Sequence, residues 1–153
     1  DVYNLFGSRV YIVTNSSTYK VKAKISKLPS DHSRIKVVGG AKKFVVDDAF
    51  NGVPEKLEVN DLERPVYLRR RNYYEVLDGI VAEAKTTRNG IVVVGDIWEL
   101  DLALPQYLGM AVGQFVRDTT PEFERKAVAN YKRGFTANNL SGIYQNLRRL
   151  RIS

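Results

Sequence analysis

The residues from Leu104 to Val116 carry the strongest periodic signal in the chain. Apolar side chains recur there at every third or fourth position, namely Leu104, Tyr107, Leu108, Ala111, Val112, Phe115 and Val116. This is the period of an amphipathic α-helix, and Pro105 stands near its first turn, where a missing N–H is tolerated. A second helix is predicted to begin at Thr120-Pro121 and a third to run from Asn139 to Arg149. Residues 103–150 are therefore predicted to form a helical hairpin or a three-helix layer.

The part of the chain before this stripe is predicted to be rich in strands. Tyr19 to Ile25 alternates apolar residues with lysines, which is the period of a half-buried strand. Gly39-Gly40 and Asn89-Gly90 each separate two apolar runs and predict hairpin turns. Ile91 to Val94 is apolar at every position, as is typical of a central strand. Trp98 to Leu102 alternates again and predicts a strand that leads into the first helix.

Together these patterns predict an α+β fold in a single domain that spans residues 1–153. An antiparallel β sheet or sandwich would occupy residues ~8–102, so that the β-rich part is 1–102 and the helical part is 103–150. The chain has 153 residues, which is enough for one domain with its own hydrophobic core.

Composition excludes several kinds of chemistry. The chain has no cysteine and a single histidine, His32, which stands in a Pro-Ser-Asp-His-Ser loop. Disulfides, thiolate catalysis and cysteine zinc sites are therefore absent, and a Ser-His-Asp triad would have to use a loop histidine. No apolar run approaches the roughly 18 residues that a membrane-spanning helix needs. The net charge of +7 is spread along the chain, which is typical of a solvated surface and also compatible with a polyanionic partner.

The acidic residues are the only catalytic candidates. Asp96, Glu99 and Asp101, with the more distant pair Asp47-Asp48 and the glutamates Glu55 and Glu58, could hold Mg²⁺ for phosphodiester cleavage. The lysine that usually accompanies such acids is absent between Leu102 and Val116. Gly39-Gly40-Ala41-Lys42-Lys43 lacks the spacing of a phosphate-binding loop and is predicted to be a turn. We therefore predict that the protein is not an enzyme and has no catalytic residue, metal site or cofactor.

Two groups of residues are candidates for interfaces. Gly109 and Gly113 would allow close approach of a neighbouring helix or subunit, since each glycine in a helix otherwise costs about 1 kcal/mol relative to alanine. The arginine-rich segments are the charged candidates: Arg69, Arg70, Arg71, Arg148, Arg149 and Arg151. Tyrosines interleave with basic residues in the β-rich part, a mixture that single-stranded nucleic acid could use for stacking and phosphate contacts.

The order of segments in the last third resembles the head-to-tail connector or adaptor proteins of tailed bacteriophages. The matching pieces are Trp98 to Leu102, Leu104 to Val112, and Glu122 to Arg125 continuing through Tyr131 to Phe135. The resemblance implies a structural virion protein, assembled in the host cytoplasm, whose copies form a ring between portal or head and tail. Its partners would be further copies of itself and other neck, portal or tail proteins, with non-specific DNA contact and no membrane. A basic nucleic-acid-binding module is the alternative, and a metal-dependent nuclease is the third interpretation.

Overall fold

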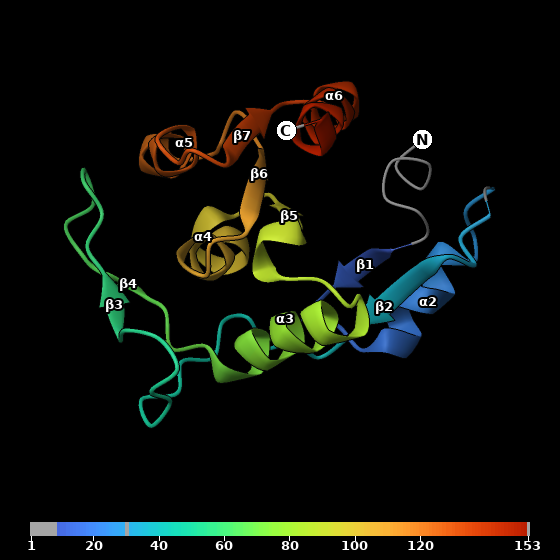
Figure 1. Ribbon diagram of the computed structural model, residues 1–153, viewed down its shortest axis with the longest axis horizontal. Helices are drawn as coiled ribbons and strands as arrows, with labels where there is room; N and C mark the ends of the chain where they lie inside the picture. The colour runs from blue at the N-terminus through green and yellow to red at the C-terminus, as the bar shows by residue number, and fades with distance from the viewer. Residues whose placement is uncertain (1–8, 30, 153) are drawn as a thin grey trace.

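The computed structural model describes residues 9–29 and 31–152, and for Arg151 and Ile152 it describes the backbone only. Parallel strands alternate with helices along the chain (Figure 1). The elements of the first half are β1 (Val10–Val13), α2 (Thr18–Ile25), β2 (Ile35–Val38), β3 (Lys56–Leu57), β4 (Val66–Tyr67) and α3 (Arg71–Glu83). Those of the second half are η1 (Arg88–Gly90), β5 (Val92–Gly95), η2 (Trp98–Leu102), α4 (Ala103–Tyr107), β6 (Ala111–Phe115), α5 (Glu122–Ala129), β7 (Gly134–Ala137) and α6 (Leu140–Ile152).

The first parallel unit is β1–α2–β2. Val10 pairs with Ile35 at the start of the register and Val13 pairs with Val38 at its end. Helix α2 makes the crossover that two parallel strands require. It begins because the Ser17 hydroxyl accepts a hydrogen bond from the amide of Lys20 at 3.4 Å, which is an N-cap contact.

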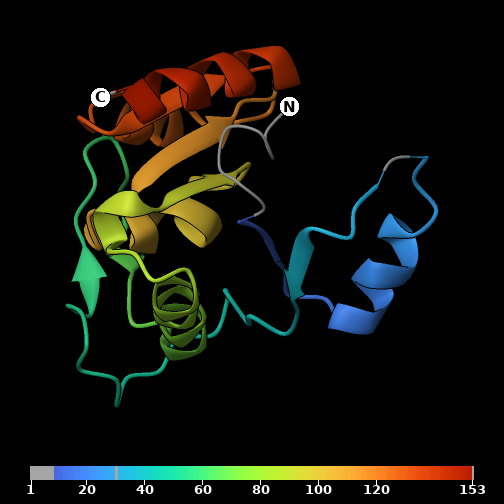
Figure 2. The same ribbon diagram turned by 45° about the vertical axis from the view of Figure 1, so that its right-hand side comes forward.

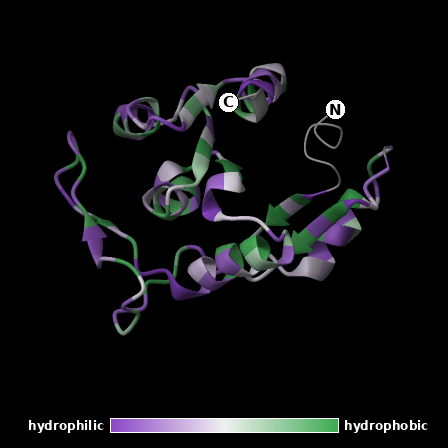
Figure 3. Cartoon of the chain, viewed as in Figure 1, coloured by the Kyte–Doolittle hydropathy of each residue, from purple (hydrophilic) through white to green (hydrophobic). Residues whose placement is uncertain are grey.

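The second parallel unit is the sheet β5-β6-β7, with α4 and α5 as its crossovers. Val92 pairs with Ala111, and Val112 pairs with Gly134. β6 lies between the other two strands, and four of its five residues are buried. The hydrophobic core is built around this strand and includes Trp98, Leu104, Met110, Val112 and Val128. In Figure 3, apolar residues stand out along β1 and β2, whereas the helices carry both apolar and polar residues.

The predicted antiparallel sheet or sandwich over residues ~8–102 is wrong, because β1 and β2 are parallel and the strands of β5-β6-β7 are parallel. Within residues 9–29 and 31–152, only the short pair β3–β4 is antiparallel. Asn89-Gly90 does not turn a hairpin, since it lies in the 3₁₀ turn η1 that leads from α3 into β5. Gly39-Gly40 follows β2 and turns the chain into a loop, with Gly40 at a φ of 67°. A parallel neighbour is always distant in sequence, so a local turn signal could not reveal it.

The segment from Tyr19 to Ile25 is a helix, not the predicted strand. Its alternation of apolar residues and lysines would form a strand only beside a sheet that buried one face, and none of its residues is buried. The Tyr19 side chain is 81% exposed. Ser17 at the N-cap, and Lys22 and Lys24 in the last turn, favour the helix.

The predicted helical hairpin or three-helix layer over 103–150 is also wrong. The helical stripe divides into α4, a turn at Gly109 with a φ of 82°, and the strand β6. A strand that is buried on both faces does not alternate apolar and polar positions, so the apolar residues of β6 appeared to continue the period of the preceding helix. Trp98 to Leu102 is a helical turn instead of a strand. The helices predicted to begin near Pro121 and Asn139 are confirmed as α5 and α6.

No helix within the described residues is both long and apolar enough to cross a membrane.

Replacing Gly113 by alanine is expected to destabilise the fold. Gly113 pairs with Phe135 across β6 and β7, and an added Cβ would lie 2.2 Å from Cζ of the Phe135 ring. Relieving this overlap inside the core should lower the free energy of unfolding by about 1–3 kcal/mol, measured by urea denaturation. Gly79→Ala is the matched control, because Gly79 lies in α3 with nothing within 4 Å of an added Cβ. That variant should gain about 0.5–1 kcal/mol. Equal effects of the two substitutions would contradict the packing.

Candidate functional site

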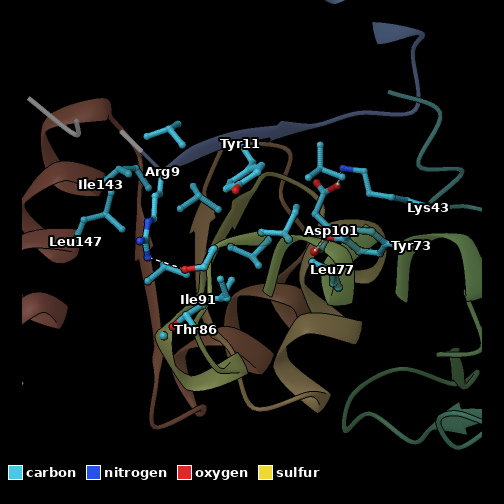
Figure 4. Close-up of a pocket in the computed structure, with 18 residues that line it drawn as sticks. Arg9, Tyr11, Lys43, Tyr73, Leu77, Thr86, Ile91, Asp101, Ile143 and Leu147 are labelled. Carbon is cyan, nitrogen blue, oxygen red and sulfur yellow. Dashed lines mark hydrogen bonds and ion pairs between the residues drawn. The ribbon is translucent and has the colours of Figure 1, made fainter. Parts of the chain in front are cut away.

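β1 and β5 run in the same direction on opposite sides of a cavity of about 480 Å³ (Figure 4). At one end, Arg9 just before β1 donates from Nη1 to the carbonyl of Ala84 at 2.6 Å, and the chain continues from Ala84 through Thr86 into β5. At the other end, Lys43 and Asp101 form an ion pair. The amide of Lys43 donates to Oδ1 of Asn15, which follows β1 closely. The carboxyl ends of both strands therefore lie at the Lys43–Asp101 end of the cavity.

The Lys43–Asp101 ion pair is the polar centre of this end. Lys43 Nζ lies 2.6 Å from Asp101 Oδ1, and each side chain is only 14% exposed. The ammonium group also lies 5.6 Å from the centroid of the Tyr73 ring. The Tyr73 hydroxyl donates to the backbone carbonyl of Asp101 at 2.7 Å. Burial raises the pKa of Tyr73, so the phenol stays protonated and keeps this hydrogen bond.

The turn after β5 positions Asp101. Its Oδ2 accepts a hydrogen bond from the amide of Ile97 at 3.3 Å, and its side chain lies directly against Gly95. A Cβ at Gly95 would lie 2.5 Å from Cβ of Asp101, so this packing requires glycine. The hydrogen bond to Ile97 and the packing against Gly95 therefore fix the Asp101 side chain in the turn after β5.

A buried carboxylate from α5 holds the same turn from the other side. Glu124 Oε2 accepts hydrogen bonds from the amide of Trp98 and from Nε2 of Gln114, both at 2.9 Å. Glu124 is only 5% exposed, and burial raises its pKa. The two hydrogen bonds connect the turn that carries Asp101 to β6 and α5.

The loop that carries Lys43 is fixed by a buried arginine. Arg70 is 4% exposed and donates from Nη1 to the carbonyl of Lys43 at 2.9 Å. Burial lowers the pKa of Arg70. Beside this loop, the Thr14 hydroxyl accepts from the amide of Ser16 at 3.1 Å, which shapes the turn after β1. The ends of both strands thus carry polar groups: Thr14, Asn15 and Ser16 after β1, and Asp96 and Asp101 after β5.

Of the seven acids considered as possible Mg²⁺ ligands, Asp101 alone is among the residues that line this cavity. Asp96 follows β5 directly and pairs with Arg117 at 2.9 Å in a contact whose side chains are 39% and 63% exposed. The Glu99 carboxylate accepts hydrogen bonds from Nη1 and Nη2 of Arg64, at 2.9 and 2.7 Å. No cluster of three or more histidine or acidic residues that could hold a metal occurs in the described part of the chain.

Sequence analysis missed the lysine of the site. The lysine was expected in the residues that follow Asp101, whereas Lys43 lies 58 positions before Asp101 in the sequence. The signal that could have found it is the placement of polar residues directly after two apolar strands, Thr14-Asn15 after β1 and Asp96 after β5.

The interface candidates are scattered over the structure. Gly109 lies in the turn after α4, and Gly113 lies in β6 under the ring of Phe135. The close approach that was expected at Gly113 is therefore made within the subunit. The three consecutive arginines contact the 43–48 loop: Arg69 bonds to the carbonyl of Asp48, Arg70 to that of Lys43 and Arg71 to the carboxylate of Asp47. Arg148 and Arg149 are exposed on α6, and the side chain of Arg151 lies outside the described residues. A role of these glycines and arginines in assembly stays a prediction.

The raised pKa of Glu124 predicts a pH-dependent stability. Its proton is held more tightly in the folded protein, so its contribution is complete below the unfolded pKa of about 4.3 and is lost as the pH rises through the folded pKa. Glu124→Gln keeps an oxygen acceptor and cannot ionise, so the stability of wild type relative to this variant should fall as the pH rises from acid to neutral. Urea denaturation across this range measures the difference. The exposed Glu122→Gln on the same helix is the control. A constant difference between wild type and Glu124→Gln would contradict the assignment.

Comparison of the chain with protein-family models, with curated proteins and with solved structures gives no match, so the chemistry of the site is inferred from its own residues.

Proposed function

We propose that the chain carries the binding site of an enzyme that hydrolyses or transfers a phosphate group of a small phosphorylated substrate with the help of Mg²⁺. The observation that supports this proposal is the Lys43–Asp101 pair at the carboxyl ends of two parallel strands. Ligands of open α/β sheets bind outside the carboxyl ends of the strands, at the point where the order of the strands reverses. In this chain that point is the space between β1 and β5.

The residue types at this end suit a phosphate group. A lysine ammonium is a common phosphate-binding group, and its positive charge offsets the negative charge on the transferred phosphoryl oxygens. Lys43 is fixed at its backbone by Arg70 and Asn15, so that it is pre-positioned for this role. The hydroxyls of Thr14 and Ser16 and the side-chain amide of Asn15 belong to the adjoining strand end and could donate to phosphate oxygens. The net charge of +7 favours an anionic ligand.

The acids of the site suit Mg²⁺ shared with a substrate. Mg²⁺ is usually held by one or two carboxylates, together with phosphate oxygens and water. Asp96 follows β5 directly and Asp101 lies in η2, the next turn of the chain. The Asp96 carboxylate is held by a partly exposed ion pair with Arg117, which is easily exchanged. Mg²⁺ would supply positive charge opposite the transferred phosphate, while Lys43 and the strand-end donors orient the phosphate.

This proposal departs from the prediction, made from the sequence, that the protein is not an enzyme and holds no metal. The connector-ring function and the nucleic-acid-binding module both stay predictions. The resemblance to connectors depended on a strand followed by two long helices over residues 98–135, and this segment folds as η2, α4, β6, α5 and β7. Arg69, Arg70 and Arg71 contact their own chain, so they favour neither alternative.

The test is phosphate binding by the site variants. Orthophosphate titrated into the wild-type chain by calorimetry should bind more tightly in the presence of Mg²⁺. Lys43→Met should weaken binding by about tenfold or more, since hydrogen bonds to charged groups contribute about 1.5–3 kcal/mol. Asp101→Asn should remove the Mg²⁺ effect. The double variant Lys43→Met/Asp101→Asn leaves no unpaired charge, so it should stay folded. Loss of phosphate binding by this folded variant would then not come from unfolding.

The control is Lys126→Met, which removes a lysine from an exposed ion pair with Asp61. This variant should bind phosphate as the wild type does. Binding that Lys43→Met leaves unchanged, or that both lysine variants weaken equally, would refute the proposed site. Turnover of p-nitrophenyl phosphate then separates an enzyme from a phosphate-binding protein.

A further inference from the structure

We propose that the space between β1 and β5 is filled by one more strand of the same polypeptide, which comes before β1 in the chain and makes a single continuous parallel sheet. The proposal is based on the strand order, the backbone and the composition of the two strands, and it does not depend on phosphate chemistry.

The strand order leaves one place vacant. From β1 the chain moves outward to β2 on one side, and from β5 it moves outward through β6 to β7 on the other (Figure 2). The order across the molecule is therefore β2-β1, the cavity, then β5-β6-β7. A doubly wound sheet has the strand order 3-2-1-4-5-6. If the strands present here are the second to the sixth, the vacant place belongs to the first.

The backbone groups on both sides of the cavity are available to pair with such a strand. The Thr14 amide donates to Val38 of β2, so the alternation of a strand points the N–H and C=O groups of Tyr11 and Val13 to the other side. Likewise, Ile91 accepts from Ala111 of β6, which points the groups of Val92 and Val94 away from β6. These groups lack a strand partner within the described residues. Backbone N–H and C=O groups are strong hydrogen-bonding groups, and these two facing edges match the two sides of a missing strand.

The composition of β1 and β5 is that of central strands. β1 is Val-Tyr-Ile-Val and β5 is Val-Val-Val-Gly, with no charge or proline in either. Proteins usually protect a free edge with charged residues, bulges or proline, and neither strand has them. Val94 is 43% exposed in the present arrangement. Both strands therefore have the sequence of an interior position of a parallel sheet.

Helices already cover the two faces of the vacant place. α3 and α6 lie on opposite sides of β5 in both views (Figures 1 and 2). Leu77 and Ile80 of α3, and Ile143 and Leu147 of α6, line the cavity between the strands. An apolar strand placed there would be buried on both faces, as strands of parallel sheets are.

In the doubly wound order the vacant place belongs to the strand that precedes β1 in the chain. A parallel strand needs a crossover of about a dozen residues or more before its neighbour begins. A strand that runs parallel to β1 and β5 would end at Lys43 and Asp101, so the residue after it would join the candidate site.

Amide hydrogen exchange followed by NMR tests the proposal. The probe is an N-terminal extension of about five valine and isoleucine residues, joined to Asp1 by a flexible glycine-serine linker of about fifteen residues. The control extension carries glycine and serine in place of the strand. The probe should slow exchange of the Tyr11, Val13, Val92 and Val94 amides by about tenfold or more. The amides of Ile12 and Val93, which point to β2 and β6, should not change.

Two outcomes would overturn the proposal. The first is unchanged exchange at the four amides in the extended chain, because pairing depends on the backbone and an apolar strand of any sequence should supply it. The second is protection of these amides in the unextended chain that rises with protein concentration, because it would assign the place to a second copy. Neither measurement involves phosphate, so failure here leaves the proposed function to be judged by its own test.

Discussion

The alignment of β1 with β5 is the constraint on which the rest of the structure depends. Within the described residues, no backbone ladder joins the two strands, and the side-chain contacts at their ends keep them in line. Arg9 bonds to Ala84 at one end and Lys43 pairs with Asp101 at the other. The second contact is mostly buried, so loss of either partner would leave an uncompensated charge in a poorly solvated place. The same pair therefore positions two halves of the molecule and forms the polar centre of the candidate site.

Much of the secondary structure could be predicted from the sequence, but the direction of the strands could not. Ile91 to Val94 was predicted as a strand and lies in β5 or immediately before it, and the helices predicted near Pro121 and Asn139 are α5 and α6. A parallel partner is joined through a helix, so its identity is not written in the residues next to a strand. The run from Ala111 to Phe115 was read as helix because a strand buried on both faces shows no alternation.

The candidate site could be predicted only in part, because the fold brings its residues together from distant positions in the sequence. Asp96 and Asp101 were considered as possible Mg²⁺ ligands from the sequence, although no metal site was predicted. Lys43 and Arg70 were not, because a lysine gains its meaning only from the carboxylate that the fold brings to it, and a buried arginine looks like a surface residue until its partners are known. Glu124 is similar, since its function is to bind the Trp98 amide in a distant turn.

The separation of the two strand groups along the chain also has a consequence for the order of folding. β5, β6 and β7 with α4, α5 and α6 form from a continuous stretch, residues 92–152, and each strand pairs with the next one in sequence. The contact between Lys43 and Asp101 spans 58 positions instead. The entropy lost on closing a loop grows with its length, and short-range contacts form fastest. We therefore expect the C-terminal half to fold first and to serve as the template on which the β1–β2 unit docks last.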